Sequence, residues 1–442
     1  MTGDELFANL PVQVNARAVE AGNPRLREPV RDQVELRALD LDSLIGPAHP
    51  ARTIWDYVQR LDLRSLEEAV RAREHTPGQA PVSPRLLLAL WLHATSEGIG
   101  SARALARLCE SHDAYRWLCG GVSVNYHGLA GFRSAHPDLL DRLLTESVAT
   151  LSAAGVIDLD EVVQDGVRVR ASAGAGSFRR KKRLHQELKK AKRLIEQLKQ
   201  EANDDPDASN RRIRAARERA AHERGARVAA ALDKLAEIEA ERVRRAKTNK
   251  KEVAKQKEPR ASTTDPQARI MKMADGGYRP AYNCQLGTVA QGQIVVSVDV
   301  TATGSDRGLL RPMLDRLKQR YGRRPKRHLV DGGFNKNDDT EWAAGAGVKV
   351  YGPPTRSKHK TDPYAPRRDD GPGVAAWRRR MQSSHGKAVY KRRSMGECIN
   401  ARVRQWRLSQ FTVRSRAKAH AVLSLFALAN NILQGRRLLL SA

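Results

Sequence analysis

Three absences limit what this chain of 442 residues can be. No run of 18 apolar residues occurs, so we expect no segment that crosses a membrane. The first residues lack a charged stretch followed by an apolar one, so we expect no secretory signal. The four cysteines lie far apart and form no C-x-x-C pair, which argues against a disulfide framework or a structural zinc site.

Acidic residues are scarce relative to basic ones. The chain has 50 Asp and Glu against 79 Lys and Arg, a formal net charge of +29. Basic side chains release the counterions that surround phosphates, so this excess predicts a nucleic-acid partner, with an acidic membrane surface as the second candidate. At about 150 residues per domain, the length predicts two to four folded units. Together these features predict a reduced, soluble, cytoplasmic protein that acts on nucleic acid.

Residues 46–158 have the apolar periodicity of helices and form the first predicted domain. Ser83, which precedes a proline, and Ser101 are typical helix starts. A short Glu-Gly-Ile-Gly turn joins the two helices that these serines begin, within residues 84–119. Such a pair suits either a DNA-reading helix-turn-helix or an ordinary helical hairpin, and the sequence leaves both open.

Residues 178–260 form a strongly basic insertion, with 27 Lys and Arg against 14 Asp and Glu. Apolar residues in 184–198 step by four and three, the spacing of a coiled coil. A turn rich in Asp and Asn at 203–210 separates them from a second periodic stretch at 213–238. The pattern predicts an antiparallel helical hairpin. Its basic faces either only face water or lie along DNA.

Strand patterns lie on both sides of this insertion. Alternating valines predict a strand at 162–169, and a Gln-Gly-Gln turn predicts a hairpin of strands 282–289 and 294–301. Further along the chain we expect a helix at 305–321, strands at 328–330 and 348–351, a long inserted loop at 353–389, and helices over 394–440. This order fits a mixed sheet with helices on its faces.

Three carboxylates occupy positions that suit catalysis. Asp165 lies in a predicted strand, Asp331 directly follows one, and Glu397 begins a helix. Such side chains converge at one edge of a sheet, and hard oxygen ligands suit Mg²⁺ or Mn²⁺. Two such ions about 3.5–4 Å apart activate a water or a hydroxyl and stabilise the leaving oxygen of a phosphodiester. Taken alone, each carboxylate is more often a turn former or a partner of the helix dipole.

The residues around Glu397 strengthen this hypothesis. Tyr390, Arg393, Glu397 and Arg404 are separated by 3, 4 and 7 positions. From Arg393 onward, these steps place the side chains on one helical face. Two cations that flank a carboxylate are unfavourable there unless an anion binds.

This series resembles the Tyr-x2-Arg-x3-Glu-x6-Lys signature of the DDE-type transposases of bacterial insertion sequences, with Arg404 replacing the final Lys. The charge is kept, although arginine is a planar fork rather than a point charge. Asp165 in QDG and Asp331 in VDGGF match the first and second acids of the family. The stretches 115–129, 262–285 and 400–414 also look similar, and the resemblance covers roughly residues 35–433.

The resemblance implies an α/β fold: a ribonuclease-H-like mixed sheet with flanking helices, an N-terminal all-helical domain and the inserted helical hairpin. Asp165, Asp331 and Glu397 would be both catalytic and metal-binding, and would hold two Mg²⁺ ions, which Mn²⁺ can replace. Tyr390, Arg393 and Arg404 would contact DNA. The expected partners are the terminal inverted repeats and target DNA, bound by a dimer that is nucleoid-associated while on DNA.

The expected organisation follows from this fold. A polar arm over 1–45 precedes the DNA-binding domain at 46–158, and the catalytic domain comprises 159–177 and 261–440, interrupted by 178–260 and 353–389. Two other functions stay open: a metal-dependent nuclease that does not join strands, and a catalytically dead DNA-binding relic. All readings expect salt-dependent DNA binding, so that property does not separate them.

Overall fold

The computed structural model of the chain describes residues 40–70, 72, 80–204, 211–248, 258–355 and 362–441. The predicted N-terminal arm therefore lies outside the described residues as far as residue 39, as do residues 205–210 of the predicted turn in the basic insertion. In the described ranges, no helix has both the length and the apolar character needed to cross a membrane.

The N-terminal region is helical, as predicted. After the short 3-10 helix η1 (Leu41–Leu44), its helices are α1 (Pro50–Gln59), α2 (Arg64–Glu68), α3 (Pro84–Ser96), α4 (Ala102–Ser111), α5 (Asp113–Cys119), α6 (Tyr126–Ala135) and α7 (Pro137–Ala153). The Ser101 hydroxyl caps α4 by accepting from the Ala104 N–H, whereas Ser83 makes no such bond to α3. The helix expected up to residue 119 is interrupted at His112, whose extended backbone and ring nitrogen cap the separate helix α5.

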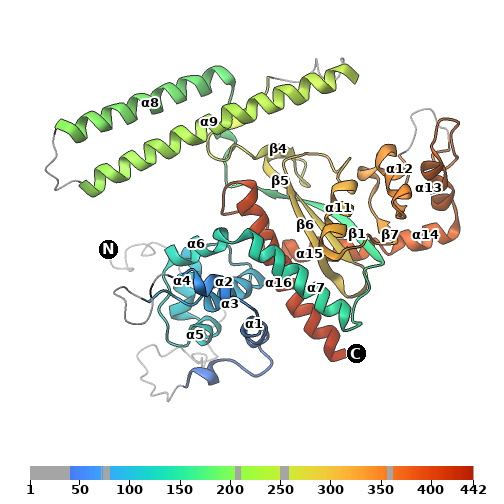
Figure 1. Cartoon of the computed structure of the whole chain (residues 1–442), viewed down its shortest axis with the longest axis horizontal. Coiled ribbons are helices and arrows are strands. Elements are labelled where there is room, and N and C mark those ends of the chain that lie inside the picture. Colours follow the sequence, from blue (N-terminus) through green and yellow to red (C-terminus); the bar gives the residue numbers. More distant parts are fainter. Residues whose placement is uncertain are drawn as a thin grey trace, which may run out of the picture. The chain divides into compact units, whose positions relative to one another are not determined.

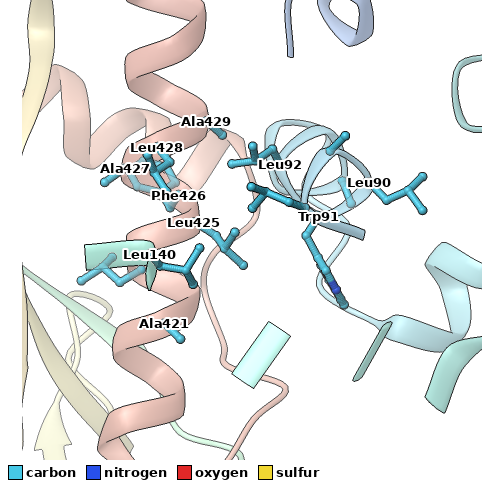
Figure 2. Packing of buried hydrophobic residues seen from close by; sticks show 14 of the residues in the cluster. Leu90, Trp91, Leu92, Leu140, Ala421, Leu425, Phe426, Ala427, Leu428 and Ala429 are labelled. Atoms are coloured by element: carbon cyan, nitrogen blue, oxygen red, sulfur yellow. The ribbon is translucent and has the colours of Figure 1, made fainter. Parts of the chain in front are cut away.

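Helix α3 is buried along its length rather than displayed as a surface helix. Every residue from Leu86 to Ala94 is buried. Figure 2 shows side chains of α3 and α7 packed around Leu425, Phe426 and their neighbours on α16 (Arg416–Ser441). Figure 1 shows the same helix α16 between the N-terminal helices and the sheet. The N-terminal helices and the sheet thus share one apolar core.

The described residues form a six-stranded mixed sheet (Figure 1). Its strands are β1 (Glu161–Arg170), β4 (Arg269–Lys272), β5 (Tyr278–Val289), β6 (Ile294–Thr301), β7 (Arg327–Leu329) and β8 (Lys349–Tyr351). The central order is β6-β5-β1-β7-β8, in which β5 runs antiparallel to β1 and β6 while β1, β7 and β8 are parallel. This is the ribonuclease-H-like mixed α/β fold that the resemblance implied.

Helices cover the sheet and fix its edge. Those that pack on it include α11 (Leu310–Tyr321), α15 (Ser394–Gln405) and α16. Asn431 of α16 accepts from the Val295 N–H at 2.8 Å and donates to the Val295 carbonyl at 2.7 Å. The side chain thereby pairs backbone groups of β6 as a neighbouring strand would.

The basic insertion is a helical hairpin of α8 (Lys181–Asp204) and α9 (Arg211–Thr248), which lie side by side in Figure 1. Leu184 of α8 is buried with Val228 and Leu235 of α9. Ion pairs from Lys181 to Glu239 and from Glu187 to Arg224 show that the helices run antiparallel. The coiled-coil character of this hairpin stays a prediction.

The expectation of a long loop at 353–389 was wrong. After residues 356–361, which lie outside the described part, the chain forms α13 (Pro372–Gln382) and α14 (Ser384–Lys391). Glu341, in the middle of the preceding helix α12 (Asn337–Gly345), accepts from the Gly373 and Val374 N–H groups and so caps α13. The composition suggested a loop because Pro, Arg, Asp and Gly are frequent in this stretch, although Val374, Trp377 and Met381 of α13 are buried at helical spacing.

Candidate active site

The sheet register brings Asp165 and Asp331 together. In the parallel pairing of β1 with β7, Val163 lies opposite Leu329. Two residues further along each chain are Asp165, within β1, and Asp331, which follows the end of β7. Adjacent strands lie about 4.8 Å apart, so the continued register puts the two aspartates level with each other. Asp331 caps a 3-10 turn, with its Oδ1 accepting from the Gly333 N–H at 2.7 Å.

Glu397 reaches the same edge from a helix. It lies in the first turn of α15, as predicted, and α15 packs on β1. The Gly396 residue beside it makes this approach close, because a Cβ atom there would lie 2.7 Å from Val163 Cγ1. The Glu397 side chain is 60% exposed, so it borders solvent while Asp165 is largely buried.

Arg393 joins two of the three carboxylates. Its guanidinium donates from Nη2 to Glu397 Oε1 at 2.6 Å and lies 3.4 Å from Asp165 Oδ2 through Nη1. Burial lowers the pKa of Arg393, but the nearby Tyr390, Asp165 and Glu397 outweigh it and raise that pKa on balance. The residue that the sequence assigned to DNA therefore neutralises the acids in this structure.

Asp165 has the electrostatics of a crowded site. Burial raises the pKa of its carboxyl group, and the charges of Asp331 and Asp306 act in the same direction. The Gly166 N–H, which donates to Asp165 Oδ1 at 2.8 Å, and Arg393 oppose this increase. Mutual repulsion of this kind is expected where carboxylates are gathered to hold a cation.

The other two predicted DNA contacts differ in their surroundings. Tyr390 lies on α14. Burial is the largest cause that raises its pKa, and the nearby charges of Asp331 and Asp165 act in the same direction. Arg404 lies in the last turn of α15 and is exposed. Among the described residues its side chain has no ion pair. The structure thus brings Tyr390 and Arg393 to the carboxylates and leaves Arg404 two turns beyond Glu397.

Two functional candidates had no signal in the sequence. Asn400, one turn after Glu397, donates to Asp165 Oδ2 at 2.9 Å. Asp306, in the loop before α11, accepts from Asn283 at 2.7 Å and Gln285 at 2.8 Å, and it adds a fourth negative charge near Asp165. Only the pairing of β1 with β5 and the packing of α15 reveal these neighbours.

The donor chemistry fits a hard divalent cation, because Asp165, Asp331 and Glu397 all offer carboxylate oxygens. Their arrangement holds a different cation, since the Arg393 guanidinium bridges Asp165 and Glu397. Within the described residues, no three Asp, Glu, His or Cys side chains stand close enough to ligate one ion.

Comparison with known families agrees with this geometry. A family described as "Transposase DDE domain" matches residues 247–432, which include Asp331 and Glu397, and one described as "Transposase domain (DUF772)" matches residues 39–134. The chain belongs to the DDE-type transposases of insertion sequences. No curated protein and no solved structure gave a significant match to this transposase.

Membership establishes the general activity. The transposase is an enzyme of the nuclease and transposase type and acts on DNA, and domains of its kind generally use divalent metal ions. The match to the DDE domain starts after β1, so it does not include Asp165. The assignment of Asp165 as the first acid therefore rests on its position beside Asp331 and not on the family match.

Proposed function

We propose that this transposase binds the terminal inverted repeats of its insertion sequence, cleaves DNA at their ends and joins the freed 3′-hydroxyl to target DNA. One observation supports this proposal most strongly. Asp165, Asp331 and Glu397 come from β1, from the turn after β7 and from α15, yet the sheet register and Arg393 connect all three. These carboxylates are far apart in the sequence, and it is the fold that brings them to one edge of the sheet.

Each of these residues has a proposed role in the phosphoryl transfer. Asp165, Asp331 and Glu397 would hold two Mg²⁺ or Mn²⁺ ions, which supply activation of the attacking oxygen and stabilisation of the leaving one. Asn400 and the Gly166 N–H fix the orientation of the Asp165 carboxylate. Tyr390, Arg393 and Arg404 lie along the path from α14 through α15, where they would contact phosphates next to the scissile bond.

The other regions would supply affinity for DNA. We assign recognition of the element ends to residues 46–158, and because α3 is buried, α4 is the better candidate for the helix that faces DNA. The basic hairpin α8–α9 would add contacts to the phosphate backbone that weaken with salt. Joining two ends requires that they be held together, so we expect the transposase to act as a dimer.

The first experiment is cleavage of labelled DNA that carries the inverted repeats flanking the gene, with Mg²⁺ present or chelated. We expect cleavage at the repeat boundary that needs the metal ion and is lost in Asp331→Asn. Asp338→Asn is the matched control, because Asp338 is seven residues away, is 82% exposed and pairs only with Lys336 among the described residues. Cleavage by Asp331→Asn at the rate of the unmodified protein would refute the assignment.

The same assay separates the alternatives. Cleaved ends that are never joined to target DNA would indicate a nuclease without strand transfer. Binding without cleavage by both the unmodified protein and Asp331→Asn would indicate a catalytically dead relic.

A further inference from the structure

Arg393 occupies the position between two carboxylates that a bound cation would be expected to take. Two of its guanidinium nitrogens contact Asp165 Oδ2 at 3.4 Å and Glu397 Oε1 at 2.6 Å. The Arg393 and Asp165 side chains are 18% and 16% exposed, so the pair is screened from water on most sides. A guanidinium group keeps its charge throughout the usable pH range. Arg393 therefore cannot free the two carboxylates by losing a proton, and it frees them only when its side chain moves away.

The contacts of Asp165 separate a fixed partner from an exchangeable one. Asn400 donates to Asp165 Oδ2 from within α15 and carries no charge, so it is compatible with a metal ion bound to the same carboxylate. Arg393 is the N-cap residue of α15 and has a long side chain that can move. The charge of its guanidinium group would repel a divalent ion at close range. Binding of a metal ion to Asp165 and Glu397 therefore requires that Arg393 release them.

We propose that Arg393 is a built-in counter-cation that holds the carboxylates of the free protein and exchanges with divalent metal ions when a DNA phosphate offers it a new partner. The inference rests on the proposed function, because it takes Asp165 and Glu397 as metal ligands. It adds an order to the reaction: the metal site forms fully only on DNA. A free transposase with an incomplete metal site is protected from cutting DNA at random.

This exchange couples two binding equilibria. If DNA removes Arg393 from the acids, DNA raises the affinity for metal ions, and metal ions raise the affinity for DNA by the same factor. Couplings of this type are typically about 5- to 150-fold. Replacing Arg393 by an uncharged residue abolishes the competition, so the free protein then binds metal ions more tightly and DNA loses its effect on that affinity.

The test is a titration of the full chain with Mn²⁺, in which free Mn²⁺ is counted by electron paramagnetic resonance, with and without a pre-cut duplex that ends at the repeat boundary. The proteins are the unmodified chain, Arg393→Gln, Arg404→Gln and Asn400→Ala. Arg404→Gln removes the same charge from the same helix without touching a carboxylate. Asn400→Ala removes the other donor to Asp165 Oδ2 without changing charge. Circular dichroism confirms that each variant is folded.

We expect DNA to tighten Mn²⁺ binding by at least about fivefold in the unmodified chain. Without DNA, Arg393→Gln should bind Mn²⁺ at least about fivefold more tightly than the unmodified chain, with no further gain from DNA, while Arg404→Gln and Asn400→Ala show no such increase. This inference alone would be overturned if the unmodified chain and Arg393→Gln bound Mn²⁺ with equal affinity while the unmodified chain still cleaved DNA in a metal-dependent way. No Mn²⁺ binding by the unmodified chain even on DNA, together with no metal-dependent cleavage, would overturn it and the proposed function.

Discussion

The contact of α15 with β1 at Gly396 offers a sharp test of the active-site geometry. A Cβ atom at this position would lie 2.7 Å from Val163 Cγ1 and 4.0 Å from Asp165 Cβ. Carbon atoms pack best at about 3.5–4.0 Å, so Gly396→Ala should move α15 away from β1 by about 1 Å. Glu397, the next residue, would move with the helix and away from Asp165.

The effect on stability should be small and the effect on cleavage large. Alanine is favoured over glycine inside a helix by about 1 kcal/mol, whereas an extra methyl group in a packed core costs about 1–3 kcal/mol. The net loss of unfolding free energy is therefore about 0–2 kcal/mol. A displacement of about 1 Å at a catalytic group lowers rates by about 100-fold. We expect this loss in single-turnover cleavage of repeat-end DNA.

Two further variants make the test specific. Gly345→Ala, at the end of α12, adds the same methyl group where no atom of the described residues beyond its own helix lies within 4 Å, and should leave cleavage unchanged. Val163→Ala in the Gly396→Ala background removes the clashing methyl groups and should restore part of the rate, which a double-mutant cycle measures. Wild-type cleavage by Gly396→Ala would refute the claim that this approach positions Glu397.

Three other predictions concern stability and are measured by urea denaturation. Arg378 and Asp370 pair at 2.7 Å and are almost fully buried, so Arg378→Met should lower the free energy of unfolding by about 3–5 kcal/mol, and a loss below about 1 kcal/mol would contradict this. Asn431→Ala leaves the Val295 backbone groups unpaired and should cost about 1–3 kcal/mol for each group, while an unchanged midpoint would show that they find other partners. Burial lowers the pKa of His328 to about 3 from an ordinary 6.5, so the folded state favours the neutral imidazole. The stability that depends on this neutral form is complete above pH 6.5 and is lost progressively as the pH drops towards 3. At pH 5 the loss of unfolding free energy amounts to about 2 kcal/mol, and His328→Gln should lose less stability between pH 7 and pH 5 than the unmodified chain.

Local patterns in the sequence were sufficient for most of the elements. Alternating valines marked β1, and the Gln-Gly-Gln turn marked the hairpin of β5 and β6. These signals are local because a strand with buried faces and a tight turn each need particular residues at adjacent positions. The three carboxylates were singled out for a related reason, since each stands at a strand or helix position that the local pattern identifies, and their catalytic role stays a prediction.

The remaining features depend on contacts between distant segments. Asn400 and Asp306 are ordinary polar residues until α15 and the loop before α11 bring them to Asp165. Helices α13 and α14 were missed because the Pro, Arg, Asp and Gly around them suggested a loop, although Val374, Trp377 and Met381 of α13 are buried at helical spacing. For the neighbours of Asp165, by contrast, no spacing rule in a single sequence contains such information.

The basic insertion shows how a long excursion is compatible with a catalytic sheet. It leaves after β1 and returns before β5, the two strands whose pairing positions Asp165. A short ladder closes its base: Phe178 pairs with Ser262 and Arg179 with Ala261 in β2 and β3. Because the two ends of the insertion meet there, the length of α8–α9 places no strain on the register of β1 with β5. The hairpin that we propose to contact DNA therefore leaves the positions of the carboxylates unchanged.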